Sequence, residues 1–258
     1  MAIPAFVQRF WRGLDALFSD VEPTWWGAVV TDGRFPRIWD ANYARVDVEA
    51  PGLTAADVET ELLPALRSAG STTEHVVTFH PESSTRLLTE LSARGHRLGW
   101  DLVMDLSEPV PPAEPIDVEE LAPNDELWGR VTASFELFGV DPEESVEQLK
   151  AIETEVMLPG GKRWFGVRDD RGTIVSVAAL VLLEEVGYVD NVATFPQARG
   201  RGYASAATRS VIEAARKAGV EGVFLLADPD EPAVVRMYER LGFRGAGRLA
   251  STRGPVEA

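Results

Sequence analysis

Cysteine is absent from the 258-residue sequence. Its absence excludes disulfide bonds, thiol nucleophiles and zinc sites built on cysteine. Histidine is also scarce, because the chain has only His75, His80 and His96, and all three lie in its first half. Three dispersed histidines do not make a metal-ligand pattern. We therefore expect no metal among the cofactors of this protein.

Basic residues are outnumbered, with 25 Lys and Arg against 41 Asp and Glu, which gives a formal net charge of −16. Nucleic acids and anionic membranes both need a basic face, so this balance argues against either as the main partner. Long apolar runs are missing too: residues 174–183 form the longest, about half of what a bilayer-spanning helix needs. Charges interrupt the first twelve residues, where a secretory signal would need an unbroken apolar core. We expect a cytoplasmic protein.

Four prolines lie within residues 107–115, which makes this segment the clearest change of composition in the chain. Proline cannot continue a helix or sit in a central strand, so the segment favours an extended, semi-stiff connector. We place the domain boundary here. Residues 1–106 are then the first domain, residues 107–115 the linker, and residues 116–258 the second domain.

The two predicted domains end with the same order of elements, strand–helix–strand–helix–strand. The predicted helix at 54–68 has a Thr54-x-x-Asp57 capping pattern, although Pro64 should kink it or end it early. Placing Gly95 on Gly242, a shift of 147 positions, superposes the two final helix–glycine–strand segments. This pattern predicts an internal duplication, with coincidence between two α/β halves as the alternative.

A glycine-rich turn between a strand and a helix is the strongest ligand signal in the sequence. The predicted strand 186–195 stops at Pro196, and a helix opens within Arg199-Gly200-Arg201-Gly202-Tyr203. Converging backbone N–H groups, the helix dipole and the missing Cβ atoms of glycine together make an anion site. The two arginines add positive charge in an otherwise acidic chain. A diphosphate fits this pattern better than a carboxylate does.

Two other interpretations of the turn are open. Residues 200–205 fall one step short of the dinucleotide pattern G-x-G-x-x-G, and Asp228 follows at about the ribose-binding distance. A dinucleotide domain needs further βαβ units after this one, however, and only about thirty residues remain. The turn can also open a helix without any ligand, because a lone glycine pair is a weak signal.

Two spaced motifs resemble the GNAT superfamily of acetyl-CoA-dependent N-acetyltransferases over residues 116 to about 253. Gln197-Ala198-Arg199-Gly200-Arg201-Gly202 is similar to the superfamily's Gln/Arg-x-x-Gly-x-Gly/Ala loop, and Tyr238-Glu239-Arg240-Leu241-Gly242-Phe243 to its Tyr-x-x-x-Gly-Phe helix ending. The resemblance implies acetyl-CoA as cosubstrate. It also implies that the backbone of Val192, Ala193 and Thr194 binds the pantetheine arm like an added strand. The implied pyrophosphate-binding residues are Arg199, Gly200, Arg201, Gly202, Tyr203 and Ala204, and Gln197 at the start of the motif is a further cofactor-binding residue.

The resemblance implies an α+β fold in an α/β three-layer arrangement, with two GNAT-like halves that each contain a mixed twisted β-sheet flanked by helices. The first half departs from the family's motifs. Glu49-Ala50-Pro51-Gly52-Leu53-Thr54 stands where the loop should be, with one glycine, no arginine and an acid that would repel phosphate. Leu91 takes the place of Tyr238. We therefore expect a degenerate first domain without a CoA loop and a catalytic second domain.

Acetyl transfer to an amine needs a base for the amine, a donor for the developing oxyanion and a proton for the departing thiolate. The resemblance assigns the acid to Tyr238 and the oxyanion donor to a backbone N–H of the strand before the loop. Alternation along that strand places Asp190 on one face with Tyr188, Val192 and Thr194. Some family members carry a catalytic glutamate near the position of Tyr188, so Asp190 is the candidate base. Bonding to a neighbouring strand end is an equally open role for it.

Acceptor selection in this fold comes largely from the first two helices of the catalytic domain, predicted at 124–138 and 141–157. The second carries one lysine and the acids Asp141, Glu143, Glu144, Glu147, Glu153 and Glu155. The acidic segment favours a small cationic amine as acceptor, although such runs are more often solvated helix faces. Monomer and homodimer are both open. The alternative to an enzyme is a non-catalytic acyl-CoA-binding or regulatory module.

Overall fold

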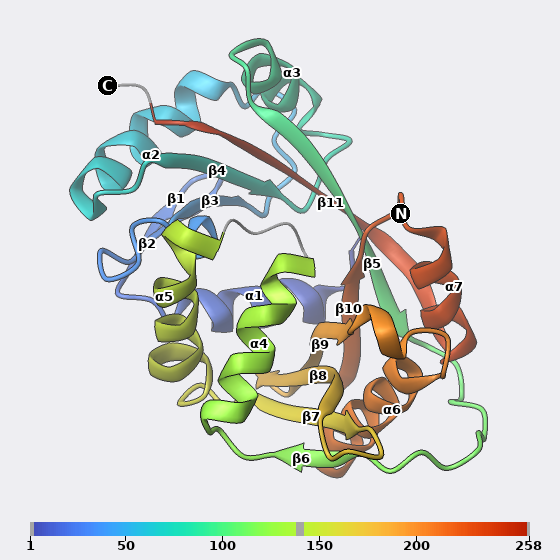
Figure 1. The fold of residues 1–258 in the computed structure, drawn as a ribbon. Helices are drawn as coiled ribbons and strands as arrows, with labels where there is room; N and C mark the ends of the chain where they lie inside the picture. The colour runs from blue at the N-terminus through green and yellow to red at the C-terminus, as the bar shows by residue number, and fades with distance from the viewer. Residues whose placement is uncertain (1–2, 138–141, 257–258) are drawn as a thin grey trace. The chain divides into compact units, whose positions relative to one another are not determined.

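The computed structural model describes residues 3–137 and 142–256. Contacts divide the chain into two compact units, of which unit 1 is Met1–Val103 with Ala246–Ala258 and unit 2 is Met104–Gly245. Each unit is described by itself below (Figure 1). Within the described ranges, no helix combines the length and the apolar character needed to cross a membrane.

Unit 1 is built on a mixed sheet with the strand order β1-β2-β3-β4-β11. Antiparallel pairs join β1 to β2, β2 to β3 and β4 to β11, and a parallel pair joins β3 to β4. The elements are α1 (Ala5–Asp15), β1 (Asp20–Thr24), β2 (Gly27–Thr31), the short 3₁₀ helix η1 (Trp39–Ala41), β3 (Tyr43–Val46), α2 (Ala55–Ala69), β4 (Thr73–Thr78), α3 (Thr85–Ala93), β5 (Arg97–Leu106) and the C-terminal part of β11 (Phe243–Pro255).

Alternation along β3 decides which helices cover which face of this sheet. Ala44 and Val46 are fully buried in a core shared with Leu62 of α2 and Leu87 of α3. The intervening Arg45 points to the other face, where it bonds to a side chain of α1. Helices α2 and α3 therefore cover one face of the sheet and α1 the other, as a half-buried strand pair requires.

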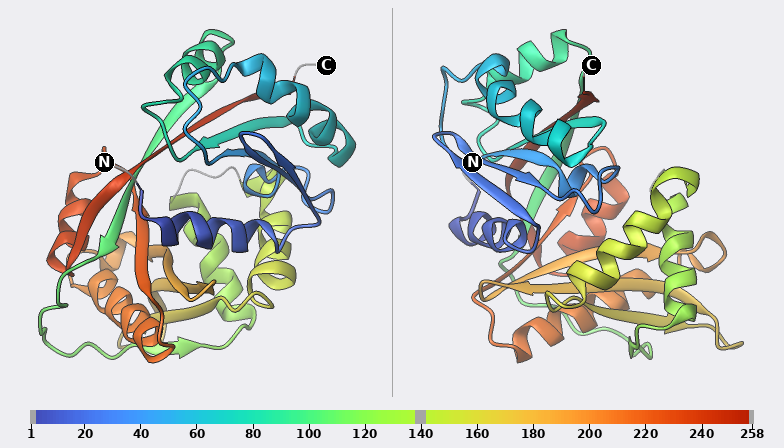
Figure 2. Two further views of the ribbon diagram at one scale, coloured as in Figure 1. Left: turned by 180° about the vertical axis from the view of Figure 1, so that it is seen from behind. Right: turned by 90° about the vertical axis from the view of Figure 1, so that its left-hand side faces the viewer.

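Unit 2 repeats this plan with the strand order β6-β7-β8-β9-β10. The ladder is antiparallel from β6 to β9 and parallel between β9 and β10. Helices α4 and α5 lie over one face and α6 over the other (Figure 2). The elements are β6 (Glu119–Leu121), α4 (Asp125–Leu137), α5 (Pro142–Ile152), the π-helical turn η2 (Glu153–Met157), β7 (Arg163–Arg168), β8 (Ile174–Leu183), β9 (Val186–Thr194), the 3₁₀ turn η3 (Pro196–Ala198), α6 (Tyr203–Lys217), β10 (Gly222–Ala227) and α7 (Pro232–Arg240).

The predicted repetition of elements is confirmed in the lengths of the matching pairs. Helices α2 and α6 each have 15 residues, strands β4 and β10 each have 6, and helices α3 and α7 each have 9. Gly95 and Gly242, which the sequence shift superposes, follow the matching helices with φ angles of +90° and +95°. Each unit is a mixed sheet flanked by helices, so the predicted fold class is confirmed as well.

Two details differ from the sequence-based expectations. Helix α2 runs unbroken through Pro64, because Leu62 and Leu66 on either side are fully buried and hold the helix against the sheet. The division into units also differs from a boundary at residues 107–115. It falls inside β5 and β11, so residues from Met104 onward count with unit 2 and residues from Ala246 onward count with unit 1. A composition break cannot reveal that a strand continues from one unit into the other.

The C-terminal strand should be sensitive to the size of the residue at position 254. Gly254 lies opposite Glu74 on β4, and a Cβ atom there would approach Cδ2 of the buried His96 ring to 2.5 Å. Gly254→Ala should therefore destabilise unit 1 by about 1–3 kcal/mol, measured by urea unfolding with tryptophan fluorescence. The control is Gly52→Ala, which adds a Cβ to an exposed site with no atom within 4 Å. Equal midpoints for the two variants would contradict the described packing of β11 in unit 1.

Candidate active site

Strand β9 contains a bulge at its middle. Asp190 lies opposite Ala179 of β8 while Ala193 lies opposite Val177, so β9 has one residue more than β8 in this stretch. Asn191 has a φ of +48°, in the left-handed region that Asn tolerates better than most residues. The bulge shifts the alternation, so Ala193 shares the face of Asp190. The prediction that Val192 and Thr194 share that face is wrong, because a period of two holds only in a regular strand.

Past the bulge, β9 separates from β10. In the described part of the chain, the last pair of their parallel ladder is Val189 opposite Leu225. Both strands continue beyond it, β9 to Thr194 and β10 to Ala227. Backbone groups on the β10 side of residues 190–194 are therefore left without a ladder partner, and buried backbone polar groups need one. An extended ligand with its own amide groups fits such a gap, as an added strand would.

The loop after β9 has the conformation that its glycines predict. Gly200 and Gly202 have φ angles of +77° and +81°, which L-residues adopt only with strain. Helix α6 begins directly afterwards at Tyr203, and no side chain caps its N-terminus. A Cβ atom on Gly200 would have no atom within 4 Å, so this side of the loop is open. The arrangement presents first-turn N–H groups and the positive end of the helix dipole, which suits an anion.

The side chains assigned to cofactor binding differ in their exposure. Ala193 is buried against α4, whereas Val192 and Thr194 are half-buried. Arg199 donates from Nε to the backbone oxygen of Thr194 at 3.1 Å, which fixes the arginine beside the end of β9. The exposed residues of the loop are Gln197, Arg199, Gly200, Arg201 and Gly202, and the half-buried first residues of α6 are Tyr203 and Ala204.

Tyr238 lies in the last turn of α7 and is only 6% exposed. Its ring packs edge-on against Phe243, with 5.9 Å between the ring centroids. Burial raises the pKa of Tyr238, and the negative charge of Asp190 raises it further. The phenol therefore stays protonated through the neutral range. The same effect places the two predicted catalytic side chains within electrostatic reach of each other.

Asp190 uses both carboxylate oxygens within the protein. Oδ1 accepts the backbone N–H of Asn191 at 2.8 Å, and Oδ2 accepts from Nζ of Lys162 at 2.8 Å. Of the two roles left open by the sequence, this geometry favours the one in which Asp190 bonds to its neighbours. Its role as a general base stays a prediction.

Lys162 is a residue of this site that the sequence did not reveal. It follows Gly160-Gly161, a context typical of an exposed turn, yet its side chain is 1% exposed. Its ammonium also contacts Glu153 Oε1 at 2.6 Å. Burial raises the pKa of Glu153, while the charge of Lys162 opposes that increase. No local pattern in the sequence marks a buried lysine, so only the tertiary contacts identify it.

The predicted acidic helix contributes less to an open acidic surface than its composition suggests. Glu153 is buried in the contact with Lys162, and Glu147 and Glu155 are exposed. Asp141 lies outside the described residues, and the side chains of 143 and 144 are not described. The helix itself ends at Ile152, followed by the π-helical turn.

The counterpart of the loop in unit 1 is closed by the protein's own carboxylates. Thr54 caps α2 in a capping box: its side chain accepts the N–H of Asp57, and Asp57 accepts the N–H of Thr54. Glu90 accepts the N–H of Ala55 at 2.9 Å. These bonds lower the pKa of Glu90 and of Asp57, so both stay ionised near neutral pH. The helix N-terminus that would receive a phosphate already holds two negative charges.

The strand gap is also closed in unit 1. The parallel ladder of β3 and β4 runs to Val46 opposite Thr78, and the N–H of Phe79 continues it to the oxygen of Val46. No segment of β3 extends past its partner, as β9 does past β10. A ligand with an extended amide chain has no free strand edge to join at this position.

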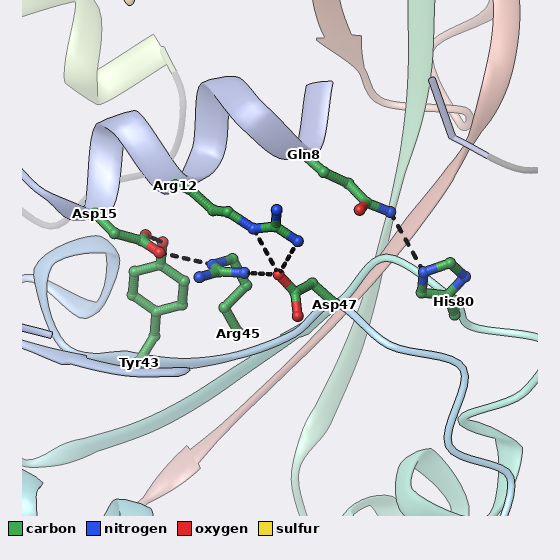
Figure 3. A network of polar contacts seen from close by, with 7 residues as sticks. All are labelled: Gln8, Arg12, Asp15, Tyr43, Arg45, Asp47 and His80. Carbon is green, nitrogen blue, oxygen red and sulfur yellow. Dashed lines mark hydrogen bonds and ion pairs between the residues drawn. The ribbon is translucent and has the colours of Figure 1, made fainter. Parts of the chain in front are cut away.

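The α1 face of β3 carries a buried ion-pair network (Figure 3). Arg45 donates from Nε to Asp15 at 2.6 Å and also pairs with Asp47, and Tyr43 donates its hydroxyl to Asp15. Arg12 of α1 binds the other side of the network through Asp47 at 2.9 Å. Side chains of the protein thus occupy the face that corresponds to the face of Asp190 in unit 2.

Residues 127–243 match the sequence profile of the Acetyltransferase (GNAT) family. The matched range contains the loop, the bulge and Tyr238. The resemblance that the two motifs predicted is confirmed by this match.

One curated relative and two solved structures extend the comparison. A mycothiol acetyltransferase from Actinosynnema mirum is 27% identical over an alignment of 221 residues, and the alignment covers 79% of this chain and 72% of that protein. A GCN5-related N-acetyltransferase from Kribbella flavida has a TM-score of 0.60 at 17% identity and covers 99% of this chain and 96% of its own. A tandem GNAT protein from the clavulanic acid biosynthesis pathway has a TM-score of 0.56 at 14% identity, with coverages of 79% and 70%. At these identities the two structures establish the fold alone.

Proposed function

Because residues 127–243 match the Acetyltransferase (GNAT) family, we propose that this protein transfers an acetyl group from acetyl-CoA directly to an amine, with unit 2 as its catalytic unit. The observation that carries the proposal is the uncapped N-terminus of α6 behind Gly200 and Gly202. The matching helix of unit 1 is capped by Asp57 and Glu90. This contrast within one chain supports a phosphate ligand for unit 2 and a non-binding role for unit 1.

The free edge of β9 and the loop divide the binding of acetyl-CoA between them. The backbone of Val192, Ala193 and Thr194 binds the pantetheine amides along the gap beside β10. The first-turn N–H groups of α6 bind the pyrophosphate, with Arg199 and Arg201 adding positive charge. Gln197, Tyr203 and Ala204 complete the loop and the first turn of the helix. The thioester supplies an acetyl group that is already activated for transfer.

Catalysis then needs a donor for the oxyanion and a proton for the thiolate. A backbone N–H at the bulge of β9 is the donor, because the bulge turns peptide groups out of the ladder. Tyr238 is the acid, since it is buried near Asp190 and stays protonated at neutral pH. Asp190 is the candidate base among the side chains, and its bonds to Lys162 and Asn191 favour a water-mediated role.

The acceptor proposed from the sequence is a small cationic amine, and the exposed carboxylates of Glu147 and Glu155 are compatible with it. Transfer without a covalent enzyme intermediate agrees with the absence of cysteine. A non-catalytic acyl-CoA-binding module would share the loop and the strand gap, so turnover is what separates the two functions.

Ligand-dependent stabilisation tests the cofactor. Acetyl-CoA at a hundred times its dissociation constant should stabilise the folded protein by about 2.7 kcal/mol, because it binds the folded state only. The measurement is a thermal-shift series with acetyl-CoA, CoA and NAD. NAD carries a diphosphate but no pantetheine arm, so it should give no shift. Stabilisation by NAD with none by acetyl-CoA would refute the proposal.

The backbone conformation of the loop offers a matched pair of variants. Gly200→Ala places an L-residue at a φ of +77°, with strain of about 1–2 kcal/mol that favours a rearranged loop. Gly219→Ala imposes the same strain at a φ of +75°, at an exposed site past the C-terminus of α6 that also has no atom within 4 Å. Both should lower the unfolding midpoint similarly. Only Gly200→Ala should weaken acetyl-CoA binding, by about tenfold in calorimetry, and equal affinities would exclude the loop as the binding site.

Removing the phenol of Tyr238 tests the acid. Tyr238→Phe should lower kcat for CoA release by about a hundredfold, because the thiolate then leaves unprotonated, while the affinity for CoA changes little. The pKa of Tyr238 is raised, so its neutral form persists at high pH and the wild-type kcat should show no loss from its ionisation below about pH 10. Binding without turnover of any amine in the wild type would favour the non-catalytic module instead.

A further inference from the structure

The ammonium of Lys162 is buried with a complete set of acceptors. Its Nζ lies 2.6 Å from Glu153 Oε1, 2.8 Å from Asp190 Oδ2 and 2.6 Å from Asn191 Oδ1. An ammonium has three protons, and three acceptors use them all. Burial by itself lowers the pKa of Lys162, but the charges of Asp190 and Glu153 outweigh burial and raise it. Lys162 is therefore a fixed positive charge at neutral pH.

Two of the three acceptors are consecutive residues of the β9 bulge. Asp190 and Asn191 both reach the same nitrogen, and Asp190 Oδ1 also accepts the N–H of Asn191. Asn191 holds a φ of +48°, a conformation that persists only where its surroundings fix it. Lys162 directly precedes β7, which lies two strands from β9 in the sheet order. Its ammonium therefore connects the side chains of Asp190 and Asn191 to a distant part of the sheet.

The bulge is where the strand edge begins to be free. The ladder with β10 ends at Val189, one residue before Asp190. The direction of the next N–H and C=O groups depends on the turn at Asn191. Asp190 also adds to the raised pKa of Tyr238, which places the bulge within electrostatic reach of the proposed acid.

We propose that Lys162 is a positioning residue, which holds Asp190 and Asn191 so that the backbone of residues 191–194 points toward the thioester of a bound acyl-CoA. This inference rests on the proposed function for the identity of the ligand. Apolar side chains in place of the whole group of charges would avoid the cost of desolvating them, so the stability of the fold alone does not require an ammonium here. The shape of the bulge does require the ammonium, because no apolar group can bind the side-chain oxygens of Asp190 and Asn191 at once.

The test compares Lys162→Met and Lys162→Arg with the wild type. Lys217→Met makes the same chemical change at an exposed position near the C-terminus of α6 and serves as the control. Because Lys162→Met leaves the buried carboxyl group of Glu153 and the half-buried one of Asp190 with no counter-charge, Glu153→Gln/Lys162→Met is made in parallel as a less charged form of the same change.

The first measurement needs no ligand. Hydrogen exchange of the backbone amide of Asn191, whose N–H donates to Asp190 Oδ1, should be at least tenfold faster in the variants that lack the ammonium, with the amides of residues 205–215 of α6 as the internal reference. Lys162→Arg should restore part of the protection, since a guanidinium also binds two oxygen acceptors. Unchanged protection in a folded Lys162→Met or double variant would overturn the proposal.

The second measurement reports on the thioester. In the wild type, the infrared band of carbonyl-labelled acetyl-CoA should move to lower frequency on binding, because a backbone N–H donates to the oxygen. The variants should lose most of this shift, with kcat lowered about 10- to 100-fold and KM for acetyl-CoA changed less than threefold. A retained band shift and kcat would overturn the proposal. A wild type that fails to bind acetyl-CoA would refute the proposed function, while hydrogen exchange would still decide whether Lys162 shapes the bulge.

Discussion

The ligand site proposed for unit 2 depends on the interruption of backbone hydrogen bonding between β9 and β10. A parallel pair that continued past Val189 would use the N–H and C=O groups of residues 190–194 internally and leave no edge for a ligand. The ladder ends directly before the bulge at Asn191, and the side chain of Asn191 accepts a hydrogen bond from the ammonium of Lys162. A strand that is central in the sheet order can thus expose part of one edge without losing its place in the sheet.

In unit 1, the protein's own groups bind the backbone at the two corresponding positions, the strand pair and the helix N-terminus. Its strand pair stays closed to the end. At the N-terminus of α2, the N–H of Ala55 donates to Glu90, the N–H of Asp57 to the hydroxyl of Thr54, and the N–H of Thr54 to Asp57. These bonds stabilise the helix in the usual way of N-terminal caps. Helix α6 has no side-chain cap, so its N-terminus lacks this stabilisation and its first N–H groups remain available as donors. The two helices have the same length and differ in their N-terminal caps.

Local patterns in the sequence were enough for the elements and for the loop. The Gly200-x-Gly202 pair predicted positive φ angles, and the Thr54-x-x-Asp57 spacing predicted a capping box, because both depend on residues a few positions apart. The bulge could not be predicted in this way. Its side chains bind Lys162, which is 28 residues from Asp190 in the chain and lies in a glycine-rich turn without periodicity. The division between the units inside β11 could not be predicted for the same reason, since the pairing of β11 with β4 is set by tertiary structure.

The buried lysine also reduces the negative charge around β9. The excess of acids in the second half suggests a negative site that attracts a cationic amine. Around β9, however, the ammonium of Lys162 already lies between Glu153 and Asp190, and burial raises the pKa of Glu153. Two carboxyl groups and one ammonium carry at most one net negative charge. Glu147 and Glu155 are exposed, and the attraction of an exposed carboxylate is screened by salt, so composition alone overstates the field at the site.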